Sequence, residues 1–149
     1  MAKECIDILG KSKLFSGFSP NQLEQIIEHL QPKTIKLKDF ERLYKRGDPA
    51  NSCWLIQSGN LMVKRTSLRT PFRRMVYHQG AVTGIRGLAD PGTKRAVTMI
   101  ADGKVKLIEI THEGISSLDK DTQILLWKNV SRLLLRKLAI CLSQHSFDD

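Results

Sequence analysis

Residues 53–63 read Cys-Trp-Leu-Ile-Gln-Ser-Gly-Asn-Leu-Met-Val, two apolar runs with Ser58-Gly59 between them. Short apolar runs bounded by turn residues are typical of buried β-strands, and glycine supplies the positive φ that a two-residue hairpin needs. We therefore expect two strands joined by a tight turn at Ser58-Gly59. Asp102-Gly103 lies between two further apolar runs, 97–101 and 105–110, and predicts a second turn of the same kind.

The spacing of apolar residues changes twice along the chain. Before residue 34 and after residue 111 they recur at helical spacing, whereas the short runs in between indicate strands. Ser19-Pro20, with Gln22 two residues later, predicts a helix start with a capping box. We expect a mainly β fold with flanking helices, in which N-terminal helices cover about 5–31, a barrel or sandwich about 34–111, and C-terminal helices, including a long one, about 112–145.

Composition and charge limit the function. The 149 residues suffice for one domain, 1–149, with its own core. Twenty-four Lys and Arg against fifteen Asp and Glu give a net charge of +9, which favours an anionic partner such as a phosphorylated small molecule, nucleic acid or a lipid surface. Three widely spaced cysteines predict neither a disulfide framework nor a metal site, and they favour a cytoplasmic location. No apolar stretch is long enough to predict a transmembrane segment.

A candidate binding site lies at Gly84-Ile85-Arg86-Gly87, which is followed by Arg95-Ala96. A glycine-flanked turn exposes backbone N–H groups, and a nearby arginine adds a two-pronged donor, so together they would form a pocket for a phosphate. The alternative is that the glycines mark an ordinary turn and the arginine is a surface residue at the start of a strand. The four histidines are scattered without metal-site or catalytic spacing, so we expect no enzymatic activity.

The order of several segments resembles the cyclic-nucleotide-binding domain family, the sensory barrel of catabolite-activator-type regulators, kinase regulatory subunits and gated channels. The matching segments are 39–50, which includes Gly47-Asp48, the strand 53–63, and the Gly84 turn followed by Arg95. The resemblance covers about 13–143. It implies a jelly-roll-type β-barrel with N-terminal helices and a long C-terminal helix.

The resemblance also implies a ligand. Arg95 matches the arginine that pairs with the cyclic phosphate, and Ala96 matches the next position, whose backbone N–H faces that phosphate. The ligand would be cyclic AMP or cyclic GMP, with no other cofactor required, bound by Gly84, Ile85, Arg86, Gly87, Arg95 and Ala96. Ile85 replaces the glutamate that grips the ribose 2′-hydroxyl, so we expect weak ribose recognition, which Ile85→Glu would restore. Thr83, Ala81 and Phe40 also depart from the family pattern.

Two functions remain open on these grounds. The first is a non-enzymatic sensor that signals through its C-terminal helix and forms a homodimer through Trp127, Leu134 and Leu138. The second is a barrel without a ligand that acts as a protein-interaction or scaffold domain for an unidentified partner. The C-terminal helix would pack on its own domain if it forms no dimer. The related transcription factors carry a helix-turn-helix module after this helix, and the residues here do not supply one, so we expect no sequence-specific DNA reading.

A basic run makes a third possibility. Its members are Lys64, Arg65, Arg69, Arg73 and Arg74. Such a run forms either a solvated hairpin tip or a surface that binds nucleic acid or an anionic membrane.

Overall fold

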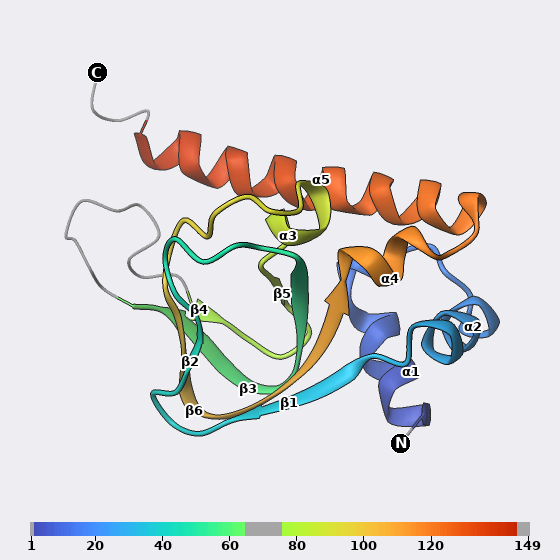
Figure 1. Cartoon of the computed structure of the whole chain (residues 1–149), viewed down its shortest axis with the longest axis horizontal. Helices are drawn as coiled ribbons and strands as arrows, with labels where there is room; N and C mark the ends of the chain where they lie inside the picture. The colour runs from blue at the N-terminus through green and yellow to red at the C-terminus, as the bar shows by residue number, and fades with distance from the viewer. Residues whose placement is uncertain (1, 65–75, 146–149) are drawn as a thin grey trace.

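The computed structural model describes residues 2–64 and 76–145. Strands curl into a barrel, a long C-terminal helix runs along one side of it, and the N-terminal helices pack at one end (Figure 1). The mainly β arrangement with flanking helices confirms the expectation from the sequence.

The N-terminal helices are α1 (Ala2–Lys11), the 3₁₀ turn η1 (Lys13–Phe15) and α2 (Pro20–Leu30). The Ser19 side chain accepts a hydrogen bond from the Gln22 N–H at 3.2 Å, and the Gln22 side chain accepts one from the Ser19 N–H at 2.8 Å. The predicted capping box is therefore confirmed, with Pro20 at the first helical position. Gln31 ends the helix in a left-handed conformation.

Six strands form one antiparallel sheet. They are β1 (Lys33–Leu37), β2 (Arg42–Tyr44), β3 (Ser52–Val63), β4 (Val76–Tyr77), β5 (Val82–Thr83) and β6 (Met99–Thr111). The order is β1-β6-β3-β4, while β2 also pairs with β6 and β5 with β3. The long strands β3 and β6 pair over nearly their whole length and form the centre of the sheet.

The two turns expected within these strands are bulges instead. β3 and β6 each continue through the predicted turn, and their register shifts between Ile56 and Asn60. Gly59 has φ +84°, and a Cβ there would collide with the Lys104 carbonyl. A glycine with positive φ serves a bulge as well as a hairpin, and here the bulge bends a continuous strand, as closing a barrel requires.

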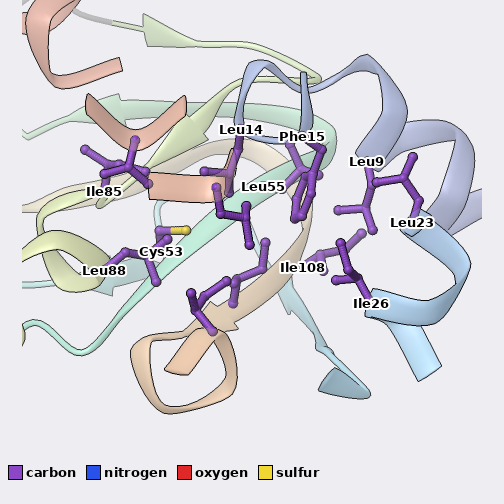
Figure 2. Close-up of a cluster of buried hydrophobic side chains, with 14 of the residues drawn as sticks. Leu9, Leu14, Phe15, Leu23, Ile26, Cys53, Leu55, Ile85, Leu88 and Ile108 are labelled. Carbon is purple, nitrogen blue, oxygen red and sulfur yellow. The ribbon is translucent and has the colours of Figure 1, made fainter. Parts of the chain in front are cut away.

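Alternating side chains of β3 divide the core into two clusters. Cys53 and Leu55 face the helices, whereas Trp54 and Ile56 face the barrel interior. Figure 2 shows the helix-side cluster, in which leucines and isoleucines from α1, α2 and the sheet meet Phe15. The barrel interior holds Met99, Val105 and Leu107 of β6.

The remaining helices in the described part of the chain are α3 (Arg86–Ala89), α4 (His112–Ser116) and α5 (Lys120–His145). α5 lies across the barrel above α3 (Figure 1). Its contact with the N-terminal helices is fixed by Asn129, whose Nδ2 donates to the carbonyls of Leu14 at 2.8 Å and Ser16 at 2.9 Å. Within residues 2–64 and 76–145, no helix is both long and apolar enough to cross a membrane.

Candidate ligand site

The glycine turn that the sequence singled out joins β5 to α3 and lies beside Arg95. Gly84 has φ +75°, and a Cβ there would lie 2.8 Å from Nη1 of Arg95 and 3.0 Å from the Trp54 ring. Any other residue would be strained and would displace the arginine. Gly84 is therefore required by both the turn and the side chain packed against it.

Arg95 is held by the backbone and by two aromatic rings. Nη1 donates to the Gly84 carbonyl at 2.9 Å, and Nη2 donates to the Ser52 carbonyl at 2.7 Å. The guanidinium carbon lies 4.6 Å from the centre of the Tyr44 ring and 4.9 Å from that of Trp54, within the range of a cation–π contact. Only 5% of Arg95 is exposed. The alternative, a surface arginine at a strand start, does not describe this residue, because it is buried.

The charge of Arg95 is buried without a carboxylate partner. Burial lowers the pKa of its guanidinium, and the neighbouring Asp48 only partly opposes this. Arginine nevertheless stays charged in proteins. No carboxylate in the described ranges forms an ion pair with Arg95, so carbonyl dipoles and ring faces compensate its charge at close range, and Asp48 acts only from beyond ion-pair distance. Two of its five N–H donors are used, which leaves donors for an anionic ligand.

The other residues predicted at the site lie in different surroundings. Gly87 is buried against the backbone of Ser52, and Ala96 is exposed. Arg86 is exposed, and its Nη2 donates to Oγ1 of Thr93 at 3.3 Å. As the first residue of α3, Arg86 also has a backbone N–H without a partner inside the helix.

Ile85 differs most from the expectation. Its side chain is 3% exposed and belongs to the helix-side core cluster (Figure 2). A glutamate side chain at this position would enter the core instead of reaching a ribose. The structure therefore leads us to expect the opposite effect of Ile85→Glu from the one that the sequence predicts.

Two aromatic residues that sequence reasoning missed border the site. The Tyr44 and Trp54 rings stack with their centres 5.5 Å apart. Burial raises the pKa of the Tyr44 phenol, whose hydroxyl lies 3.5 Å from Oγ1 of Thr83. Nε1 of Trp54 is buried, and within the described part of the chain it has no hydrogen-bond partner. Nothing local in the sequence marks these two residues as neighbours, because they lie on different strands.

Lys137 of α5 is a third missed residue. Its side chain is half-buried, and burial, followed by the charge of Arg86, lowers the pKa of its ammonium group. Arg95 acts on Lys137 in the same direction. The charges of Arg86, Arg95 and Lys137 thus act on one another across the contact between α3 and α5. The basic run predicted at 64–74 lies outside the described residues apart from Lys64, which is exposed.

Structural comparison relates the fold to several solved proteins. A cyclic nucleotide-binding domain from Methylobacillus flagellatus matches with a TM-score of 0.81 at 17% identity, over 99% of this chain and 84% of that chain. The Thermus thermophilus catabolite activator protein matches with a TM-score of 0.73 at 23% identity, over 86% of this chain and 59% of that chain. The regulatory domain of Toxoplasma gondii PKA, solved with cAMP, matches with a TM-score of 0.69 at 18% identity, over 88% of this chain and 50% of that chain. These matches confirm the jelly-roll-type fold.

Comparison with sequence families gives the identity of the domain. A comparison with curated proteins finds no match. The model of the cyclic nucleotide-binding domain, in contrast, matches residues 34–121, which is more than half of the chain and includes nearly the whole barrel. This confirms the resemblance noted from the sequence. The chain belongs to the cyclic nucleotide-binding domain family.

Proposed function

We propose that the chain is a non-enzymatic regulatory module that binds a phosphate-bearing ligand, cyclic AMP or cyclic GMP, at Arg95. The observation that carries this proposal is a buried guanidinium with free donors and no paired carboxylate among the described residues. An unpaired buried charge is costly. A bound phosphate would compensate it, and the backbone N–H at the start of α3 would add a donor.

Binding would require a movement, because Arg95 is nearly inaccessible. Tyr44 and Trp54 pack against its guanidinium, and Lys137 of α5 lies within electrostatic range of it. A ligand that displaces these groups would favour a second arrangement of α5 relative to the barrel. The strength of such a signal is limited by how much better the ligand binds one arrangement than the other.

A thermal-shift titration with cyclic AMP and cyclic GMP tests the proposal. A ligand at a hundred times its Kd adds about 2.7 kcal/mol to the free energy of unfolding. Arg95→Ala alone would be ambiguous, because it also leaves the Gly84 and Ser52 carbonyls without their donor. Arg95→Lys keeps the charge but loses the two-pronged donor, so it should abolish most of the shift in a folded protein. Lys94→Ala, at the exposed neighbouring cation, is the control and should leave the shift unchanged.

A barrel without a ligand is the second candidate, and the stacked rings favour it. Tyr44 and Trp54 pack against Arg95 and satisfy it partly from within the protein. Under this alternative neither nucleotide shifts the melting temperature. Arg95→Lys would then lower the stability of the protein without affecting any ligand response.

We further propose that the module forms a homodimer through α5. Four large apolar side chains on this helix are exposed, and successive members are eleven, three and four residues apart: Ile124 67%, Leu135 63%, Leu138 53% and Leu142 60%. Lys128 and Ser131 complete the stripe. Such a stripe is typical of a coiled-coil seam. It differs from the predicted face, since Trp127 and Leu134 pack partly on the domain's own core.

A further inference from the structure

A lysine-rich corner of the barrel lies on the side remote from α5, where β1 turns into β2 (Figure 1). Lys36 of β1 stands directly opposite Lys106 of β6 in the antiparallel pairing. Like charges in this arrangement destabilise a sheet. Lys38 and Lys104 lie beside them, and all four lysines line a hollow of about 360 Å³.

The hollow is suited to an anion. Leu37 and Val105 also line it, but their side chains belong to the barrel-interior cluster, so the lysines are the groups that a ligand would meet. Glu41 is the one acidic residue among the lining residues, and its Oε2 already accepts the Lys38 N–H at 3.1 Å. Repulsion among the lysines would be relieved by an anionic group seated here.

The turn beside the hollow projects an aromatic side chain into solvent. Phe40 is 69% exposed, and its φ of +62° lies in the left-handed region, which is strained for a bulky residue. Glycine would adopt this conformation without strain. Because the Phe40 side chain contributes little to the core, the fold gains nothing that would offset this strain.

Hydrogen bonds hold this turn in one conformation. The Glu41 N–H donates to the Lys38 carbonyl at 3.0 Å, and the Phe40 N–H donates to the Ala101 carbonyl at 3.0 Å. Oδ1 of Asp39 accepts the Gly103 N–H at 2.7 Å. The turn is therefore tied to β6 at several points, and the aromatic ring stands out from a rigid support.

We propose that this corner, Phe40 with Lys36, Lys38, Lys104 and Lys106, docks the domain on an anionic lipid bilayer. The lysines would meet phospholipid headgroups, and the ring would enter the boundary between headgroups and acyl chains. A free phosphate would use the lysines but not the ring, so the exposed ring favours a bilayer. This surface is separate from Arg95, and α5 stays accessible when the domain is docked.

Vesicle co-sedimentation tests the proposal directly. The full chain should bind vesicles of phosphatidylcholine containing roughly 30% phosphatidylserine, not phosphatidylcholine alone, and added salt should release it. The double variant Lys36→Gln/Lys106→Gln should weaken binding roughly tenfold or more. Lys11→Gln/Lys13→Gln removes the same charge from exposed lysines at the N-terminal helices and should have a much smaller effect.

Phe40→Gly gives two readouts of opposite sign. It should weaken vesicle binding roughly tenfold, because the inserting ring is lost. It should also raise the melting temperature, because glycine relieves the left-handed strain. A variant that is more stable yet binds vesicles less cannot be explained by misfolding.

Three results would overturn the proposal. One is a wild-type protein that fails to bind the anionic vesicles at low salt. Another is vesicle binding that neither Phe40→Gly nor the lysine pair reduces. The third is a response to inorganic phosphate or single-stranded RNA that depends on Lys36 and Lys106, combined with vesicle binding that does not depend on them. The corner would then serve a soluble anion or a nucleic acid.

Discussion

Residue 85 lies where the glycine turn meets the helix-side core. Ile85→Glu would bury a carboxylate among the aliphatic side chains of the helix-side cluster. We expect this variant to be destabilised by several kcal/mol or to fail to fold, and not to bind cyclic nucleotides more tightly. Urea unfolding followed by circular dichroism measures the loss, and Ile85→Val is the matched control at roughly 0.5–1.5 kcal/mol. A stable Ile85→Glu protein with tightened nucleotide binding would show that the side chain turns to the pocket.

The buried thiol of Cys53 should make the stability of the protein depend on pH in the alkaline range. Burial raises the pKa of its thiol far above the usual value, while the nearby Arg95 partly opposes this shift. The folded protein therefore keeps the proton above about pH 8.5, where the unfolded chain loses it. This contribution to stability is fully present below that pH and is lost as the pH rises toward the folded-state pKa.

We expect the free energy of unfolding to fall by about 1 kcal/mol between pH 7 and 9.5 through Cys53 alone. The variant Cys53→Ala should be less stable at pH 7, but its free energy of unfolding should fall less steeply as the pH rises. The two proteins must be compared because the lowered pKa of Lys137 makes stability rise with pH, opposite to the effect of Cys53. Lys137 is present in both proteins, so its contribution cancels in the comparison. Burial raises the pKa of Tyr77 to about 12, so this residue lowers the free energy of unfolding only above about pH 10. Equal slopes for the two proteins would contradict this account.

Among the elements, α5 depends on Asn129 for its contact with the N-terminal helices. This residue is buried, and its Nδ2 serves two carbonyls, those of Leu14 and Ser16. Asn129→Ala should lower the free energy of unfolding by about 2–4 kcal/mol, since two acceptors lose their donor and a cavity forms. Arg132→Ala on the exposed side should change it by less than about 0.5 kcal/mol. Hydrogen exchange should show that residues 2–16 lose protection first, and an unchanged exchange pattern would refute the coupling.

The elements also show what could be predicted from the sequence. The helix at Ser19 was predictable because a capping box needs only neighbouring residues. The bulges at Gly59 and Gly103 were not, because a positive-φ glycine fits a hairpin and a bulge equally well, and the choice depends on the partner strand. Arg95 was found by its place in an ordered pattern. Its contacts with Tyr44 and Trp54 depend on tertiary packing, which local spacing does not encode.

For the whole molecule, the arrangement separates three surfaces. Arg95 packs against Tyr44 and Trp54 of the barrel strands, the stripe consists of side chains exposed on α5, and the turn from β1 to β2, which carries Phe40, lies on the side of the barrel remote from α5 (Figure 1). Docking, dimerisation and ligand binding would therefore not compete for the same residues. Since α5 carries both Lys137 and the stripe, a movement of this helix would couple the ligand site to the dimer.

The stripe on α5 predicts the oligomeric state. Light scattering at micromolar concentration should give twice the monomer mass, because four exposed apolar side chains on one face of a helix are buried by a second copy. Leu135→Glu/Leu138→Glu should give a monomer with an unchanged circular dichroism spectrum, since both residues are exposed in the single chain. Arg136→Glu alters an exposed residue on another side of the same helix and should leave the dimer intact. Leu134→Glu should instead lower the stability of the fold, because Leu134 packs against the core. A wild-type monomer at high concentration, or a dimer that survives the double substitution, would place the interface elsewhere and remove the proposed route from ligand to partner.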